Sequence, residues 1–276
     1  MTDAKDTNID PRYIHRALEE AIEQGHTETI EYLLASGGCQ INSYGFTQIT
    51  QIKKISKKSI ILAANNATEL ESWNLQEILS LGYNDFASVT ATLQKITKLN
   101  HWNISEILSL PCLNLEMLKL ALSKVDYINP DHIQKILESN YANDLDLIKL
   151  TLEKLVKLEP WNLTELLKVP GLTTEILELA LDKATLIEPW NLEEILKMEN
   201  IGYDLLKKAV EKTNYLRTWD LDILLEQENL DSTILKDAVT KTDIISDKQC
   251  KIIAGLDFIP NDIAEIMLSI MQANAT

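Results

Sequence analysis

The chain has 276 residues, of which 45% are hydrophobic and 25% are charged, as in soluble globular proteins that bury a continuous core. With 26 Lys and Arg against 42 Asp and Glu, its formal net charge is −16. Binding to nucleic acid or to an anionic membrane requires clustered cations, so we expect neither as a partner.

Residues 1–14 are polar and carry charges throughout, which predicts a short N-terminal arm and no secretory signal. The sequence also has no run of the roughly 18 apolar residues that cross a membrane as a helix. Cys39, Cys112 and Cys250 lie far apart without a CxxC pair, so we expect no disulfide framework and no cysteine-based zinc site. These features favour a reducing, cytoplasmic location.

Two short helices with a turn at Gly25-His26 are predicted over residues 15–43. From position 73 onward, five near-copies of one phrase appear, each starting with a tryptophan: WNLQEIL at Trp73, WNISEIL at Trp102, WNLTELL at Trp161, WNLEEIL at Trp190 and WDLDILL at Trp219. Their spacings are 29, 59, 29 and 29, and an eroded copy, DHIQKIL, divides the gap of 59. The period predicts repeats that start near positions 15, 44, 73, 102, 131, 161, 190, 219 and 247.

Recurring cap residues predict two helices in each repeat. In the copy at position 161, Asn162 is the expected N-cap, Glu165 its capping-box partner, and Trp161 a staple residue that packs on Leu166. A second cap is expected twelve residues after each start, at Thr27, Ser56, Asp85, Asn114, Asp144, Thr173, Gly202 and Asp231. Helices this short must stack on neighbours to bury their apolar stripes, which predicts an all-α solenoid of about nine two-helix repeats, in one domain over 15–276.

The first repeat contains ALEEAIEQGHTETIEYLLASGG at 17–38, with its GH turn, a second helix that ends in Leu-Leu, and a glycine pair followed by Ile41-Asn42. In these features it resembles an ankyrin repeat. Later repeats lack TPLH and GH and have about 29 residues instead of 33, so the resemblance implies an ankyrin-like stack with short or absent β-hairpins. Such degenerate stacks resemble ankyrin-type effectors of intracellular bacteria, which implies a cytoplasmic protein translocated into a host cell.

A leucine-rich repeat has an overlapping period, and LEMLKL at 115–120 imitates its LxxLxL phrase. The asparagine that should follow is missing, and the helix caps contradict a strand, so this alternative is disfavoured. Tryptophans at regular intervals could also form a stacking surface for a ligand. The staple interpretation is preferred, because it also accounts for the cap spacing and the negative charge.

No pattern of catalytic or cofactor chemistry is present. The four histidines show no HExxH or HxH spacing, and the chain has no glycine-rich phosphate loop and no GxSxG elbow. We therefore expect no catalytic residue, no cofactor and no metal. The alternative is an enzyme or enzyme subunit with a site hidden in the solenoid groove, which a buried cluster of converging polar groups without capping duty would favour.

Two features indicate a surface for a protein partner. One is the exposed face expected on the acidic first helices: Thr164, Glu165, Lys168, Glu193, Glu194, Lys197, Asp222 and Glu226. The other is the only dense basic cluster: Lys53, Lys54, Lys57 and Lys58. Residues 1–100 hold 9 Lys and Arg against 12 Asp and Glu, whereas residues 101–276 hold 17 against 30, so a partner with a basic region would be steered toward the C-terminal two-thirds. The predicted function is a non-enzymatic protein-binding scaffold or regulator, such as an effector or inhibitor of another protein.

Overall fold

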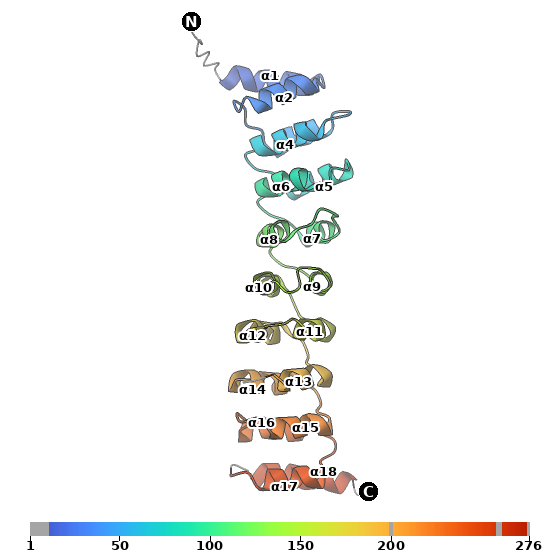
Figure 1. Ribbon diagram of the computed structural model, residues 1–276, viewed down its shortest axis with the longest axis vertical. Helices are drawn as coiled ribbons and strands as arrows, with labels where there is room; N and C mark the ends of the chain where they lie inside the picture. The colour runs from blue at the N-terminus through green and yellow to red at the C-terminus, as the bar shows by residue number, and fades with distance from the viewer. Residues whose placement is uncertain (1–10, 199–200, 258–260, 275–276) are drawn as a thin grey trace. The chain divides into compact units, whose positions relative to one another are not determined.

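A computed structural model of the chain describes residues 11–198, 201–257 and 261–274. These residues form eighteen α-helices, α1 to α18, and contain no β-strand (Figure 1). Contacts between Cα atoms divide the chain into two compact units, unit 1 ending at Ile128 and unit 2 beginning at Asn129. Each unit is described by itself, and the single domain expected over 15–276 stays a prediction.

Unit 1 contains α1 to α8, in which even-numbered helices pack on the next even-numbered helix, and α3, α5 and α7 pack in a second row. The N-terminal arm predicted over 1–14 falls in part outside the described residues, and α1 includes its last four residues. The helices span Pro11–Glu23 (α1), Thr27–Ala35 (α2), Ser43–Thr50 (α3), Lys57–Asn66 (α4), Ser72–Ser80 (α5), Phe86–Lys95 (α6), His101–Ile107 (α7) and Leu115–Ser123 (α8).

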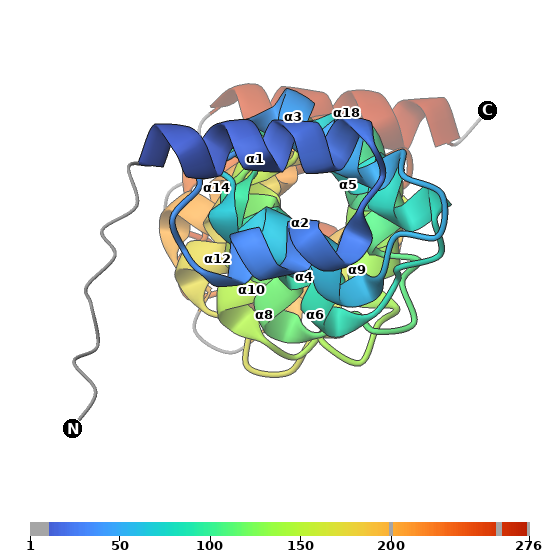
Figure 2. The ribbon, with the colours of Figure 1, turned by 90° about the horizontal axis from the view of Figure 1, so that it is seen from above.

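Unit 2 contains α9 to α18 and repeats the same two rows, with α9, α11, α13, α15 and α17 in one and α10, α12, α14, α16 and α18 in the other. In Figure 2, α10, α12 and α14 follow one another around an arc, so successive hairpins are rotated about the stacking direction. The helices span Pro130–Leu137 (α9), Leu145–Lys154 (α10), Pro160–Leu167 (α11), Thr174–Lys183 (α12), Pro189–Leu196 (α13), Tyr203–Lys212 (α14), Thr218–Leu225 (α15), Ser232–Thr240 (α16), Asp247–Ala254 (α17) and Asn261–Asn274 (α18).

Apolar residues at helical spacing form the core between neighbouring hairpins. In α12, Ile176, Leu177, Ala180 and Leu181 are all buried, because this helix packs on α10 on one side and on α14 on the other. An isolated helix of eight to ten residues cannot bury such an apolar stripe by itself. The hairpins therefore fold only when they stack on their neighbours. The prediction of an all-α solenoid of two-helix repeats is confirmed.

Single backbone bridges join the loops that follow successive second helices. The Leu158 amide donates to the Lys183 carbonyl at 2.8 Å, and the Thr185 amide donates to the Leu158 carbonyl at 3.1 Å. The same parallel pairing recurs in both units: Ile41 with Ala67, Leu70 with Ile96, Leu99 with Val125, Leu158 with Ala184, Ile187 with Thr213, and Leu216 with Thr242. Each bridge satisfies backbone groups that the helix ends leave unpaired.

The second caps lie where the spacing predicts them, with one exception. Ser56, Asp85, Asn114, Asp144, Thr173, Gly202 and Asp231 are all N-caps of even-numbered helices, and all but Gly202 accept a hydrogen bond from the following backbone. The prediction for Thr27 was wrong by one position, since Thr27 is the first residue of α2 and His26 is its N-cap.

The first caps were assigned wrongly from the sequence. The N-cap of α11 is Glu159, so Asn162 is the third helical residue, and its Oδ1 accepts a hydrogen bond from the Glu159 amide at 3.4 Å. Pro160 takes the first helical position, where its missing N–H and fixed φ favour it. The phrase Glu-x-x-Asn, rather than Asn-x-x-Glu, is therefore the capping box.

The asparagines of the phrases in α11 and α13 also join neighbouring first helices. Asn162 donates from Nδ2 to the Pro130 carbonyl at 3.3 Å and to Gln134 Oε1 at 2.9 Å. Asn191 repeats this one hairpin later, donating to the Pro160 carbonyl at 3.2 Å and to Thr164 Oγ1 at 2.7 Å. Both asparagines are buried, so hydrogen bonds within and between repeats replace the bonds that their amides would make to water.

The staple prediction for the tryptophans was also wrong. Because α11 begins at Pro160, Trp161 is its second residue rather than the residue before an N-cap, and its side chain extends from the first turn into solvent. All five rings are about half exposed or more: Trp73 at 50%, Trp102 at 66%, Trp161 at 57%, Trp190 at 51% and Trp219 at 53%.

Candidate protein-binding surface

The candidate residues of α11 and α13 divide into exposed ion pairs and joints between helices. Lys168 pairs with Glu165 at 2.7 Å, and Lys197 pairs with Glu193 at 2.6 Å and with Glu194 at 3.1 Å. Hydrogen bonds to Glu193 from Lys197, the larger cause, and from Arg217 lower the pKa of Glu193. Thr164 is a joint, since it donates to the Pro160 carbonyl at 3.0 Å and accepts from Asn191.

The candidates on α15 differ in the same way. Asp222 Oδ1 accepts from Gln249 Nε2 of α17 at 3.2 Å and lies 3.8 Å from Lys248 Nζ, so it connects two repeats. Glu226 is the C-cap of α15 and is exposed. Of the candidate residues in the described part of unit 2, Glu165, Lys168, Glu194, Lys197 and Glu226 are therefore the ones without a joining contact between repeats.

One repeat replaces the asparagine by Asp220, and a cation compensates for it. The Arg217 guanidinium donates to the fully buried Asp220 through Nε and Nη2, both at 2.7 Å, and to Glu193 Oε2 at 2.8 Å. Arg217 Nη2 also donates to the Pro189 carbonyl at 2.9 Å, the bond that an asparagine amide makes in the preceding repeats. The pKa of Arg217 is raised, with the hydrogen bond to Asp220 as the largest cause.

The Arg217 guanidinium also lies on the Trp219 ring, 4.6 Å from its centroid. This is a cation–π contact in which the N–H groups of the same guanidinium donate to carboxylates of Asp220 and Glu193. Among the described tryptophans, Trp219 alone has such a contact.

An open cleft lies between the Trp161 and Trp190 rings of unit 2. It has a volume of about 380 Å³ and is lined by Pro160, Trp161, Thr164, Glu165, Glu188 and Trp190. Sequence reasoning missed this cleft because it preferred a staple role for the tryptophans over a stacking surface. Pro160 and Pro189 were the available signal, since proline favours the first helical position and thereby puts each tryptophan at the second.

The basic cluster consists partly of structural ion pairs. Lys57 pairs with Asp85 at 2.8 Å and Lys58 with Glu31 at 3.0 Å, joining neighbouring hairpins of unit 1, while Lys53 and Lys54 lie exposed in the loop between α3 and α4. Hydrogen bonds from Ser56, Ser59 and Lys58, in that order, lower the pKa of Glu31 to about 2.

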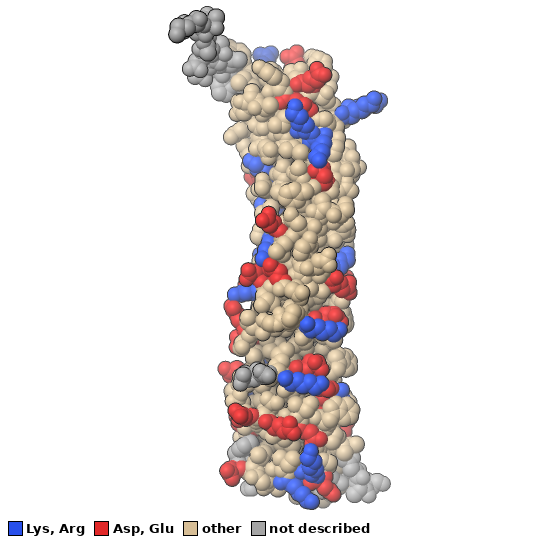
Figure 3. Space-filling view, in the orientation of Figure 1, with Lys and Arg blue, Asp and Glu red and all other residues tan. Residues whose placement is uncertain are grey.

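The pKa of Asp85 is also lowered to about 2. Its burial, the largest single effect, raises the value, and bonds from Lys57 and Ser88 together outweigh it. Figure 3 shows the general pattern, with Lys and Arg lying beside Asp and Glu on the visible face. Opposite charges are thus interspersed rather than separated.

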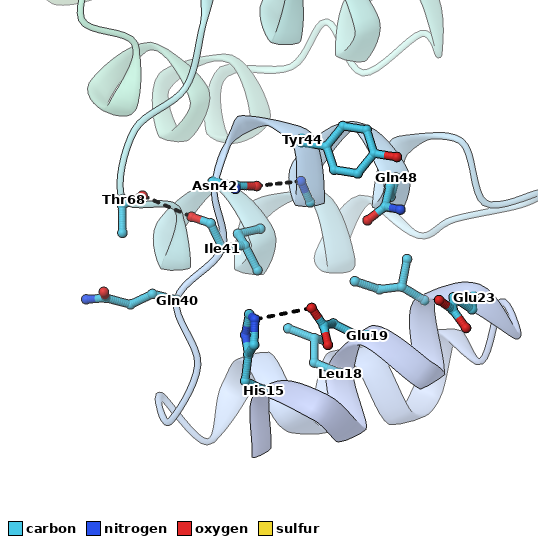
Figure 4. A pocket seen from close by; sticks show the side chains of 12 residues that line it. His15, Leu18, Glu19, Glu23, Gln40, Ile41, Asn42, Tyr44, Gln48 and Thr68 are labelled. Atoms are coloured by element: carbon cyan, nitrogen blue, oxygen red, sulfur yellow. Dashed lines mark hydrogen bonds and ion pairs between the residues drawn. The ribbon is translucent and has the colours of Figure 1, made fainter. Parts of the chain in front are cut away.

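A larger cleft of about 470 Å³ lies between α1 and α3 (Figure 4). Some of its polar groups are engaged locally: His15 Nε2 lies 3.4 Å from Glu19, Asn42 accepts from the Gly45 amide at 2.8 Å, and Thr68 donates to the Ile41 carbonyl at 3.2 Å. These contacts cap a helix and fix a loop, and they do not direct a set of groups at one point in the cleft.

Over the described ranges 11–198, 201–257 and 261–274, no group of three or more His, Cys, Asp and Glu residues is arranged to hold a metal ion. Burial raises the pKa of all three thiols, Cys39, Cys112 and Cys250, which disfavours the nucleophilic thiolate. No helix within those ranges combines the length and apolar character needed to span a membrane.

No protein-family model matches the chain, and no curated protein matches it. Among solved structures, a designed armadillo repeat protein in complex with the peptide (KR)4 is 13% identical, with a TM-score of 0.14, over 97% of this chain and 95% of the other. An engineered protein is 12% identical, with a TM-score of 0.15, over 97% and 93%. Superposition this weak adds nothing to the argument, and the helix stacking described above defines the class: a helical repeat protein of the α-solenoid type.

Proposed function

We propose that this chain is a non-enzymatic protein-binding scaffold or regulator that engages one protein partner through the first-helix surface of unit 2. The observation that carries the proposal is that equivalent side chains recur at the same position in successive first helices. Helices α11, α13 and α15 each present a tryptophan ring and acidic side chains at the same turn of the repeat. Repetition of equivalent groups along neighbouring helices offers an extended partner one similar contact per repeat.

The buried polar groups support a scaffold rather than a hidden catalytic site. The fully buried threonines donate to the carbonyl four residues earlier in their own segment: Thr92 to Ser88, Thr151 to Leu147, Thr213 to Ala209, and Thr242 to Ala238. A part-buried polar group is centred on Glu77, whose Oε2 accepts from Thr47 at 3.0 Å, Asn74 at 3.1 Å and Thr50 at 3.3 Å. It joins α3 to α5, and Asn74 within it caps α5.

The ankyrin-type features of residues 17–42 extend the proposal. We propose that the stack is of the ankyrin-like kind, and that the protein acts in the cytoplasm as an effector or inhibitor after translocation into a host cell. A translocation assay with a reporter fused to the chain tests this extension independently of the binding surface.

Site-specific photo-cross-linking tests the binding surface. A photoreactive amino acid replaces Glu194 on α13 in one variant and Glu178 on α12 in the other, since both positions are exposed. We expect one protein to be captured specifically from Glu194, and purified partner to reproduce the cross-link. Capture from Glu178 alone would transfer the interface to the second helices, and turnover of a substrate by the chain would establish the enzyme alternative.

A further inference from the structure

The Trp161, Trp190 and Trp219 rings of unit 2 are exposed aromatic surface that the fold does not need. Each ring leaves the first turn of its helix and remains more than half exposed, while the core between hairpins is filled by aliphatic residues. Large aromatic side chains in solvent are characteristic of contact surfaces for other molecules. Their recurrence at one register indicates a repeated contact.

One of the three rings already shows which group it accepts. The Arg217 guanidinium lies on the Trp219 ring and donates to the carboxylates of Asp220 and Glu193. The chain thus contains its own complex of a guanidinium, an indole face and carboxylates. Arg217 stands two residues before its tryptophan.

The equivalent position in the two preceding repeats carries the opposite charge. Glu188 stands two residues before Trp190, and Glu159 two residues before Trp161. The cleft between these rings has carboxylates of Glu188 and Glu165 in its lining. Lys168 pairs with Glu165 at 2.7 Å, and its side chain is 64% exposed, so a partner can displace it at little cost.

We infer that the cleft between Trp161 and Trp190 binds an arginine or lysine side chain of an extended basic segment in a protein partner. The cation lies against an indole face and pairs with Glu188 or Glu165, as Arg217 does with its own carboxylates. This inference rests on the proposed function and supplies the partner's chemistry. A single-stranded nucleic acid also stacks on aromatic rings, but its phosphates would face these carboxylates.

The test uses the full chain and a fluorescein-labelled octa-arginine peptide, with binding followed by fluorescence anisotropy. Trp161→Ala/Trp190→Ala should weaken binding about tenfold, since each exposed cation–π contact contributes a few-fold. Circular dichroism should remain unchanged because the rings are exposed. Tyr215→Ala removes another exposed aromatic side chain of unit 2 and should change affinity less than twofold.

Three charge-matched variants separate the cleft from general attraction to an acidic protein. Glu188→Arg/Asn191→Asp copies the Arg217 and Asp220 pair into the preceding repeat and should fill the cleft from within, weakening binding about tenfold. Glu188→Gln has the same change in net charge and should weaken it about threefold. Glu178→Gln, again with the same change but on α12, should leave affinity within twofold.

Equal losses for Glu188→Arg/Asn191→Asp and Glu178→Gln, or wild-type affinity without the two rings, would overturn the inference. Tryptophan-dependent binding of an oligothymidylate of similar length in place of the peptide would overturn it as well. The proposed function fails separately, if Glu194 gives no specific cross-link. A cross-linked partner whose binding survives loss of both rings would remove the inference and leave the proposed function intact.

Discussion

The pair formed by Arg217 and Asp220 provides the sharpest test of how the repeats are held together. Removing the guanidinium with Arg217→Ala leaves the Asp220 carboxylate fully buried, with the residue 217 amide, 2.9 Å away, as its remaining described donor. The Pro189 carbonyl loses its bond from Arg217 Nη2 at the same time. The cost arises from groups left behind in the interior rather than from the loss of an attraction at the surface.

The structure allows the size of this effect to be estimated. Removing one partner of a buried ion pair costs about 3–5 kcal/mol. Arg217 is 18% exposed and Asp220 keeps its backbone donor, so we expect the lower end, about 3 kcal/mol. The double variant Arg217→Glu/Asp220→Asn recreates the Glu-x-x-Asn phrase, whose amide can donate to the Pro189 carbonyl, and should lie within about 1 kcal/mol of the native chain.

Urea unfolding followed by circular dichroism at 222 nm measures both differences, and hydrogen exchange of the α13 and α15 amides localises them. The single variant should unfold at clearly lower urea concentration, and the double variant should recover most of the loss. A loss below about 1 kcal/mol for Arg217→Ala, or no recovery in the double variant, would show that the carboxylate is not held as described.

Three further predictions concern stability and binding. Asn162→Ala should lower the free energy of unfolding by about 1–3 kcal/mol, because it leaves the Glu159 amide and the Pro130 carbonyl without their partner. Trp161→Ala should lower it by less than about 1 kcal/mol, because the ring is exposed. The opposite order in urea unfolding would show that the ring is buried. The pKa of Glu31 is lowered from 4.5 to about 2, so its contribution to stability is complete above about pH 5 and is lost as the pH falls toward 2. Glu31→Gln should therefore make stability fall less steeply with pH in this acid range. An unchanged acid range in the stability–pH curve would contradict the assignment. Reversing two exposed first-helix carboxylates, Glu194 and Glu226, to Lys should slow partner association about tenfold at low salt with an unchanged helical signal. The control reverses two exposed second-helix carboxylates, Glu178 and Glu211, to Lys, and equal effects of the two pairs would count against the proposed surface.

Much of the fold could be predicted because the repeat is visible in the sequence as phrases at a regular spacing of about 29 residues. The spacing of the tryptophan phrases and the second caps indicate helix pairs, and helix pairs too short to fold alone indicate stacking. The first caps could not be placed by pattern alone. Asn162-x-x-Glu165 and Glu159-x-x-Asn162 both have capping-box character, and only the preference of Pro160 for the first helical position decides between them.

The candidate surface was predicted only in part, because the contacts that a side chain makes with a neighbouring repeat depend on how the hairpins are placed in space. Nothing in the sequence distinguishes Glu165, which remains on the surface, from Asp222, which accepts from α17. Lys57 and Lys58 likewise look like a free basic patch in the sequence, although their carboxylate partners lie more than 25 residues away. Contacts of this range become visible only when neighbouring hairpins are placed side by side.

The single backbone bridges between loops, such as Leu158 with Ala184, have a consequence for how such a protein can change over generations. These bonds use only main-chain N–H and C=O groups, so any residue except proline can form them at the donor position. A duplicated segment of one repeat length therefore carries a docking edge that already fits its parent. Copies can be gained, lost or allowed to diverge, as the DHIQKIL segment has, while the attachment between neighbours is inherited unchanged.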